Sequence, residues 1–234
     1  MNKNIVKKII LVINLVLFIL ISIGNYFFIT QGGTTLKGFT SFGFVLMGLV
    51  NIGFALYNKE KELKGMIALV IGLFFAMLGD ILLGKGTMFA VGAGLFALGH
   101  VGYYVSYCLL NKKNKLDFII SGAIFIATVL FLTFFPLLSF PDLLMRVVCY
   151  VYAAIISLMV GKAISNYINI KNIVNLVLMI GGIMFFISDF MLVLDWFTEI
   201  GSWTGRVCMG LYYPAQCVLA FSPCVIILNK YYKK

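Results

Sequence analysis

The feature that most constrains the fold of this chain is a series of eight apolar runs, each long enough to cross a bilayer. A spanning helix needs about 20 consecutive, mainly apolar residues, and short polar or glycine-containing connections separate runs of that length. Only 11% of the 234 residues are charged, less than half of the ~25% usual in soluble domains. The sequence therefore predicts an all-α polytopic membrane protein, a bundle of eight transmembrane helices forming one membrane domain over residues 1–234. The runs cover residues 8–29, 38–57, 65–84, 88–110, 117–138, 142–161, 172–194 and 206–229.

Basic residues are concentrated in every second connection, which predicts how the chain is oriented in the membrane. Fourteen of the 18 lysines and arginines fall in the two tails and in every second connection. Cytoplasmic segments of membrane proteins carry such an excess, so both termini are predicted to be cytoplasmic. These fourteen are Lys3, Lys7, Lys8, Lys59, Lys61, Lys64, Lys112, Lys113, Lys115, Lys162, Lys171, Lys230, Lys233 and Lys234. The other side receives Lys37, Lys85, Arg146 and Arg206.

The net charge of +10 is explained by this orientation, so no nucleic-acid partner is expected. Usage of lysine, asparagine and isoleucine is typical of an AT-rich bacterial genome, and the predicted location is the bacterial cytoplasmic membrane. The five cysteines form no Cys-x-x-Cys pair and no cluster with histidine, so neither a metal site nor a cofactor is predicted.

Two aspartates, Asp80 and Asp189, lie inside the third and seventh apolar runs. An ionisable group in a spanning helix costs roughly 3 kcal/mol on insertion scales, so such residues usually serve chemistry or ion handling. Both helices are predicted to run outward, with each aspartate about one turn from the non-cytoplasmic end. Two alternatives remain: a hydrogen bond between helices, or solvation at the membrane interface.

Further polar residues are predicted in the same half of the membrane. His100 and Tyr103 lie in the fourth run, and the alternative for His100 is a neutral imidazole bonded to a neighbouring helix. Tyr212, Tyr213 and Gln216 surround Pro214 in the eighth run, where the alternative is a packed proline kink with interfacial tyrosines. The sixth run adds Arg146, Tyr150 and Tyr152. Lys85, Arg146 and Arg206 could meet a phosphate at the interface, or simply snorkel toward water.

Four short motifs, considered together, resemble one family over nearly the whole chain. The family is the YhhN-like lysoplasmalogenase family of eight-helix membrane proteins. The motifs are Gly79-Asp80-Ile-Leu-Leu83, His100-x-x-Tyr103, Ser188-Asp189 and Tyr212-Tyr-x-Ala-Gln216. This resemblance implies hydrolysis of the vinyl-ether bond of lysoplasmalogen, a lysophospholipid, to a fatty aldehyde and a glycerophospho-head group. It also implies that Asp80 and Asp189 match the family's two essential aspartates, and that membrane lipids surround the protein.

Enol-ether hydrolysis is chemistry that two buried carboxyl groups can perform. It begins with transfer of a proton to the vinyl carbon, which needs a carboxylic acid that stays protonated near neutral pH. A second carboxylate can stabilise the resulting oxocarbenium ion and activate water. The residues alone do not assign which aspartate is the acid. Two other functions remain open: a proton- or cation-coupled transporter of a small amphiphile using the same aspartates, and a non-catalytic scaffold or lipid-binding protein.

Overall fold

The chain folds into an antiparallel bundle of membrane-spanning helices. The computed structural model describes residues 3–83 and 87–232, and over these residues it contains eight helices and no strand. All eight are long and apolar enough to cross a membrane, so the prediction of an all-α protein with eight spanning helices is confirmed. The helices are α1 (Lys3–Gln31), α2 (Thr34–Tyr57), α3 (Leu63–Leu82), α4 (Thr87–Leu110), α5 (Lys115–Phe134), α6 (Leu143–Asn169), α7 (Ile173–Phe197) and α8 (Trp203–Tyr232).

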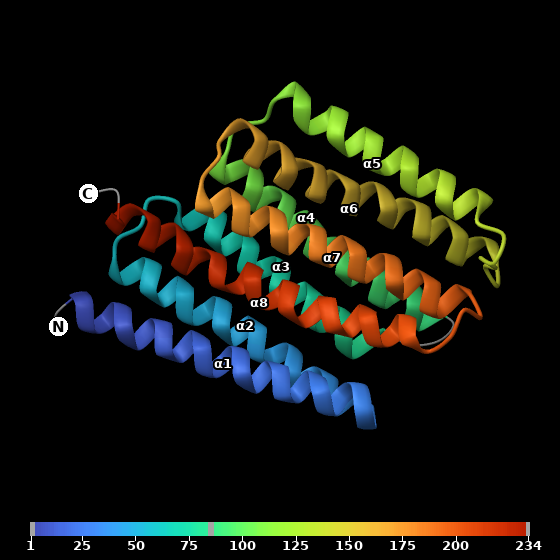
Figure 1. The fold of residues 1–234 in the computed structure, drawn as a ribbon, viewed down its shortest axis with the longest axis horizontal. Coiled ribbons are helices and arrows are strands. Elements are labelled where there is room, and N and C mark those ends of the chain that lie inside the picture. Colours follow the sequence, from blue (N-terminus) through green and yellow to red (C-terminus); the bar gives the residue numbers. More distant parts are fainter. Residues whose placement is uncertain (1–2, 84–86, 233–234) are drawn as a thin grey trace.

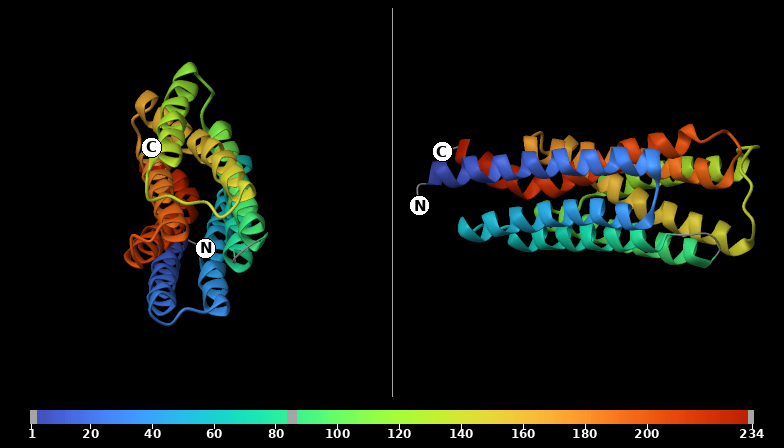
Figure 2. Two further views of the ribbon diagram at one scale, coloured as in Figure 1. Left: turned by 90° about the vertical axis from the view of Figure 1, so that its right-hand side faces the viewer. Right: turned by 90° about the horizontal axis from the view of Figure 1, so that it is seen from below.

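The helices alternate in direction, so α1 begins and α8 ends at the same end of the bundle (Figure 1). We call this the basic end, because the connections after α2, α4 and α6 lie here with their lysines. The other connections lie at the opposite end. Two rows of helices are visible in Figure 2, one containing α1, α8 and α7 and the other α2, α3 and α4. Helices α1 and α5 lie at opposite edges, and α8 lies between α1 and α7 in its row and also contacts α2 and α3 of the other row. That the basic end is cytoplasmic stays a prediction.

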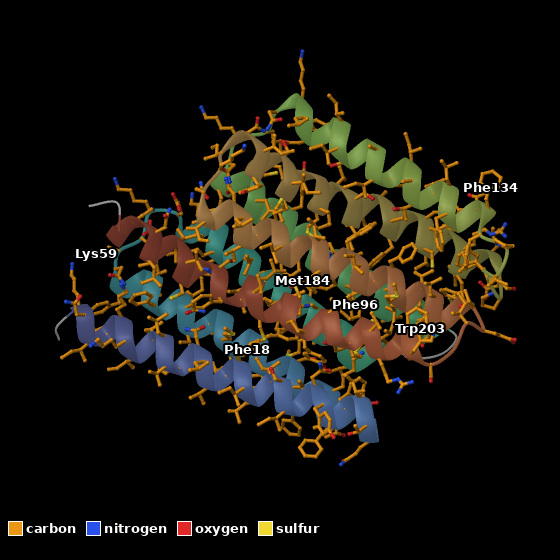
Figure 3. All side chains as sticks on the ribbon, viewed as in Figure 1. Phe18, Lys59, Phe96, Phe134, Met184 and Trp203 are labelled. Atoms are coloured by element: carbon orange, nitrogen blue, oxygen red, sulfur yellow. The ribbon has the colours of Figure 1, made fainter. Side chains whose placement is uncertain are left out.

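Apolar side chains cover the outside of the bundle, as contact with lipid requires. Phe18 on α1 is 42% exposed and Phe134 on α5 is 74% exposed, and Phe134 lies at the outer edge of the bundle in Figure 3. In contrast, α8 is the most deeply buried of the spanning helices. Side chains on α8 are therefore well placed to organise an internal site.

Glycines allow α3 and α4 to pack with their backbones in close contact. A Cβ atom added to Gly102 would lie 2.9 Å from the Cα atom of Gly72 and 3.0 Å from the carbonyl oxygen of Ala68. A Cβ atom on Gly72 would lie 2.6 Å from the ring of Tyr103. Small residues at such crossings are typical of helix packing in membranes. This contact fixes α4, which carries His100 and Tyr103, against α3, which carries Asp80.

Two helix ends differ from the predicted ones for identifiable reasons. Helix α5 ends at Phe134 rather than at residue 138, because Pro136 disfavours a helical conformation at Phe135, which is extended. Helix α6 continues to Asn169 rather than ending at residue 161. The polar residues 165–169, predicted as a break, are helical because their side chains find partners within the bundle. Asn166, for example, donates to the carbonyl oxygen of Tyr107 at 3.3 Å. The other helix ends lie within five residues of the predicted ones.

The longer α6 corrects the assignment of Lys162 to a connection. Its side chain is fully buried, and Nζ lies 2.8 Å from Oδ2 of Asp117 on α5. The same ammonium group donates to the carbonyl oxygen of Lys112 at 2.8 Å. Lys162 is thus one partner of a buried ion pair that joins α6 to the start of α5.

Candidate functional site

Asp80 lies among donors from two other helices, near the opposite end of the bundle. The Nζ atom of Lys37 forms an ion pair with Oδ1 at 3.0 Å. Ser41 donates a hydrogen bond to Oδ2 at 2.5 Å, and Tyr212 donates to the same oxygen at 2.6 Å. The Asp80 side chain is only 1% exposed. Two hydroxyl donors and an ammonium group, with no acceptor, suit an ionised carboxylate, which can only accept hydrogen bonds.

Lys37 and Ser41 are missing from the sequence-predicted site. They lie four residues apart on α2, so one helical face presents both to Asp80. We expected Lys37 in a connection, but α2 begins at Thr34 and Lys37 is buried. Its ammonium group also lies 5.7 Å from the centre of the Phe28 ring. The spacing of a lysine and a serine on one face of an apolar helix is the signal that could have identified them.

Asp189 has a different set of partners, contributed by α4 and α6. Tyr152 donates to Oδ2 at 2.5 Å, and Nε2 of His100 lies 3.1 Å from the same oxygen. His100 Nε2 also lies 2.7 Å from the Tyr152 hydroxyl oxygen. Since the single hydroxyl proton of Tyr152 goes to Asp189, a proton on Nε2 completes the triangle. Among the described residues no lysine or arginine forms an ion pair with Asp189.

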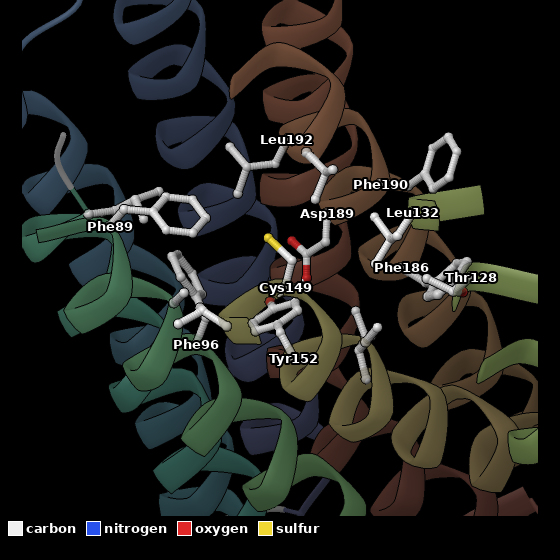
Figure 4. A pocket seen from close by; sticks show the side chains of 16 residues that line it. Phe89, Phe96, Thr128, Leu132, Cys149, Tyr152, Phe186, Asp189, Phe190 and Leu192 are labelled. Atoms are coloured by element: carbon white, nitrogen blue, oxygen red, sulfur yellow. Dashed lines mark hydrogen bonds between the residues drawn. The ribbon is translucent and has the colours of Figure 1, made fainter. Parts of the chain in front are cut away.

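The Asp189 carboxyl group faces a largely apolar chamber between α4, α5, α6 and α7. The cavity has a volume of about 60 Å³, and Figure 4 shows Asp189 and Tyr152 at its wall with Cys149 beside them. The Asp189 side chain is 11% exposed. Its Oδ1 atom makes no hydrogen bond to the described residues, whereas Oδ2 accepts its bonds. The other chamber walls are aromatic and aliphatic, with contributions from Phe89, Phe96, Leu132, Phe186, Phe190, Leu192 and Val193.

A second, more polar space leads from the opposite end of the bundle to Asp80. It is a wide opening lined in part by Lys37, Asp80, Asp195 and Arg206. Leu83 and Leu192 line both this opening and the chamber. The two aspartates therefore border two neighbouring spaces that share these leucines.

Aromatic rings link the two aspartate networks inside the bundle. The Phe185 ring centre lies 4.6 Å from that of His100 and 5.3 Å from that of Tyr212. His100 contacts Asp189, and Tyr212 contacts Asp80. Phe185 thus lies between a partner of one carboxyl group and a partner of the other. The two carboxyl groups share no hydrogen-bond partner among the described residues.

The two aspartates lie at different distances from their helix ends. Asp80 is two residues, about 3 Å, from the end of α3. Asp189 is eight residues, about 12 Å, from the end of α7. The expectation of one turn is wrong for Asp189, because α7 continues to Phe197.

The remaining predicted residues divide into those that surround the aspartates and those that do not. Tyr213 lies 3.1 Å from Ser41 Oγ and donates to the carbonyl oxygen of Lys37 at 3.3 Å. Tyr103 donates to Gln216 Oε1 at 2.7 Å, and both side chains are fully buried. Arg146 is exposed on α6, where its guanidinium lies 5.8 Å from the centre of the Phe140 ring, and it lines neither space. Lys85 falls outside the described residues.

Comparison with known proteins places the chain in a family. The sequence profile of the YhhN family matches residues 34–223, which include both aspartate networks. The chain belongs to the YhhN family. No curated protein matches the chain, and no solved structure matches it.

The matched region leaves all of α1 outside, although α1 supplies Phe28 beneath Lys37. All residues that contact the two carboxyl groups come from α2, α4, α6 and α8 and lie within the family match. Over the described residues, no cluster of three metal-ligating side chains occurs. This YhhN-family chain thus contains one carboxylate, Asp80, paired with a cation, and one carboxyl group, Asp189, that faces an apolar chamber.

Proposed function

We propose that this protein is an intramembrane hydrolase that cleaves the vinyl-ether bond of lysoplasmalogen by acid/base catalysis with Asp189 and Asp80. The observation that carries the proposal is the contrast between the two carboxyl environments. Asp80 has an ammonium partner and two hydroxyl donors, whereas Asp189 has no lysine or arginine partner among the described residues and faces an apolar cavity. Two carboxyl groups in such different surroundings are typical of acid/base pairs.

In this mechanism Asp189 is the general acid. Tyr152 and His100 both bond to Oδ2, which leaves Oδ1 to carry the proton toward the chamber. Transfer of that proton to the vinyl carbon gives an oxocarbenium ion. Water then adds to the carbon that bears the ether oxygen, and the hemiacetal breaks down to the aldehyde and the alcohol of the head group. One water is consumed: its first proton passes to Asp80 and then to the departing alcohol oxygen, and the hemiacetal hydroxyl proton restores Asp189.

Asp80 has the complementary role of an anion. A carboxylate fixed by Lys37, Ser41 and Tyr212 needs no reorganisation when positive charge develops on the substrate. The same carboxylate can accept the proton of the attacking water. Lys37 keeps the anion compensated in the apolar interior between turnovers.

The two spaces suit a single-chain lipid. At about 60 Å³ the apolar chamber has room for only the few carbons of the chain next to the ether, and the polar opening with Arg206 can take a phosphate. The vinyl-ether bond lies at the junction of the chain and the glycerol. A lipid bound in this way would place that bond near Leu83 and Leu192, where the two spaces meet.

Aldehyde release by the purified protein tests the proposal. In detergent, without any ion gradient, lysoplasmalogen should yield fatty aldehyde, while the analogue with a saturated alkyl ether should remain intact. Asp80→Asn and Asp189→Asn should each lower the rate by at least 100-fold. Glu199→Gln, an exposed acid away from both spaces, is the control and should keep the wild-type rate. Hydrolysis that survives in both aspartate variants would refute the mechanism, and lipid uptake into vesicles without hydrolysis would favour the transporter.

A further inference from the structure

A line of buried polar side chains runs from Asp189 toward the basic end, and the proposed mechanism does not use most of it. On α4, His100, Tyr103, Tyr107 and Asn111 are separated by three, four and four residues. At about 100° per residue these four positions fall within about 80° of one another, on one helical face. The first three side chains are fully buried. The line extends from His100 to Asn111, eleven helical steps or about 16 Å along the helix axis.

Three other helices add polar side chains along the same line. Gln216 on α8 accepts from Tyr103 at 2.7 Å. Asn166 on α6 donates to the carbonyl oxygen of Tyr107 at 3.3 Å. Asn175 on α7 donates to the carbonyl oxygen of Asn166 at 3.1 Å and accepts from Asn111 at 3.1 Å. The line thus continues, between α4, α6, α7 and α8, to the partly exposed Asn111 at the end of α4.

Several polar atoms along this line have no hydrogen-bond partner among the described residues. They are His100 Nδ1, Gln216 Nε2, Tyr107 Oη and Asn166 Oδ1. Buried polar groups in native proteins are almost always satisfied, and where no protein group reaches them the partner is ordered water. Four such atoms on one line, in a protein surrounded by lipid, indicate a set of water sites rather than four separate defects.

Gly182 on α7 lies beside the Tyr107 hydroxyl group. A Cβ atom built on Gly182 would lie 3.5 Å from Sδ of Met159, 3.6 Å from the Cβ atom of Ala163 and 3.9 Å from Tyr107 Oη. The glycine thus leaves one side of this unpaired hydroxyl group without a side chain. A buried water needs both polar partners and room, and we expect one at this place on the line.

We propose that ordered water molecules bridge His100, Gln216, Tyr107 and Asn166, and that they form an internal water path from the basic end of the bundle to the Asp189 site. With Nε2 of His100 protonated toward Asp189 and Tyr152, Nδ1 is an acceptor and can receive a hydrogen bond from the last water of the path. The path ends at the His100–Asp189 contact. Beyond it, Phe185 separates His100 from Tyr212 and the Asp80 network.

The role that we assign to this path, supplying water for hydrolysis, rests on the proposed function. Each turnover consumes one water, and the chamber next to Asp189 is lined almost entirely by apolar side chains. A chain that fills this chamber would exclude water from that side. The water path reaches Asp189 from the opposite direction, through His100, and can deliver water while lipid is bound.

X-ray hydroxyl-radical footprinting tests the path without reference to activity. Radicals formed from bound water label the side chains next to it, even in a protein interior. Tyr103 and Tyr107 are fully buried, and Phe54, a buried ring in an apolar cluster, is the control. We expect Tyr103 and Tyr107 to be labelled at least fivefold more than Phe54. Equal protection of all three rings would overturn the proposal.

A matched pair of variants on α4 tests the role of the path. Tyr107→Phe removes the unpaired hydroxyl group but keeps the ring, whereas Tyr104→Phe removes a hydroxyl group from a neighbouring, partly exposed position of the same helix. Tyr107→Phe should lower the labelling of Tyr103 and reduce kcat for aldehyde release about fivefold, with KM unchanged. Tyr104→Phe should change neither. If the wild-type protein is labelled at Tyr103 but releases no aldehyde, the water path is supported and the hydrolase proposal is refuted. If it releases aldehyde but Tyr103 is protected, the hydrolase proposal is supported and the water path is refuted.

Discussion

At the scale of single residues, the Lys37–Asp80 ion pair makes the sharpest stability prediction. The Lys37→Met variant leaves the Asp80 carboxylate with hydroxyl donors but no cation, in an interior where the side chain is 1% exposed. Removing one partner of a buried pair typically costs about 3–5 kcal/mol, whereas replacing both with neutral groups of similar volume can be nearly neutral. We therefore expect the single variant to melt at a markedly lower temperature in detergent, and Lys37→Met with Asp80→Asn to recover much of the loss. Equal melting temperatures for the single and double variants would contradict the pairing.

Tyr152 makes a separate prediction about catalysis. Its hydroxyl group donates to Asp189 and contacts His100, so Tyr152→Phe leaves Asp189 with one partner fewer. Asp189 becomes charged when it gives its proton to the substrate, and a hydrogen bond to a charged group is worth roughly 1.5–3 kcal/mol. Loss of this bond therefore corresponds to a fall in kcat of about 10- to 100-fold. Tyr150→Phe is the control, because Tyr150 contacts Thr133 on α5 rather than either aspartate. Steady-state aldehyde release measures both variants, and an unchanged kcat for Tyr152→Phe would remove it from the site.

The same residues show which parts of the site the sequence could predict. Asp80, Asp189 and His100 stand out because an ionisable group in an apolar run is costly and needs a reason. Burying Lys37 in the membrane costs a similar free energy, but Lys37 follows Gly32 and Gly33 closely and therefore resembles a charge at the membrane interface. Its role depends on where α2 begins and on its contact with α3, which are long-range features of the fold. Tyr152 is one of many tyrosines, and only its distance to Asp189 distinguishes it.

At the scale of helices, the contact between α3 and α4 makes a prediction with an internal control. In Gly102→Leu the new Cβ atom would lie 2.9–3.0 Å from backbone atoms of α3, which cannot move aside without shifting the helix. In Gly94→Leu, on the same helix, the Cβ atom has no neighbour within 4 Å. Overpacking typically costs about 1–3 kcal/mol or more. We expect Gly102→Leu to lower the melting temperature in detergent and Gly94→Leu to leave it unchanged.

Helix existence was more predictable than helix ends, and α5 and α6 show why. A run of 20 apolar residues has one favourable structure in lipid, a helix, because all its backbone groups must be satisfied internally. The ends depend on local chemistry and on neighbours. Pro136 is a local signal for the end of α5. The last two turns of α6 depend on partners from other helices, such as the Tyr107 carbonyl group for Asn166 and Asp117 for Lys162, and a polar sequence alone cannot reveal these.

At the scale of the whole molecule, the corrected helix ends strengthen the asymmetry of charge. With Lys37 and Lys162 assigned to the helix interior, thirteen of the remaining basic residues belong by sequence position to the basic end and three to the opposite end. The three are Lys85, Arg146 and Arg206. An excess of this size near the ends of spanning helices fixes orientation during insertion. The basic end should therefore face the cytoplasm, and the opening to Asp80 should face away from it.

Reporter fusions test this orientation and, with it, the direction of the two routes into the protein. Green fluorescent protein fused after Lys234 should fluoresce, because it folds in the cytoplasm. Alkaline phosphatase inserted after Ser139, in the connection between α5 and α6 at the opposite end, should be active, because it requires an exported, oxidising environment. The reversed pattern would place the lipid opening on the cytoplasmic side and the water path on the other. The opening is lined by Lys37 and Arg206, whereas the path contains only neutral groups and His100. With the expected orientation, the lipid head group enters from outside the cell and the water enters from the cytoplasm.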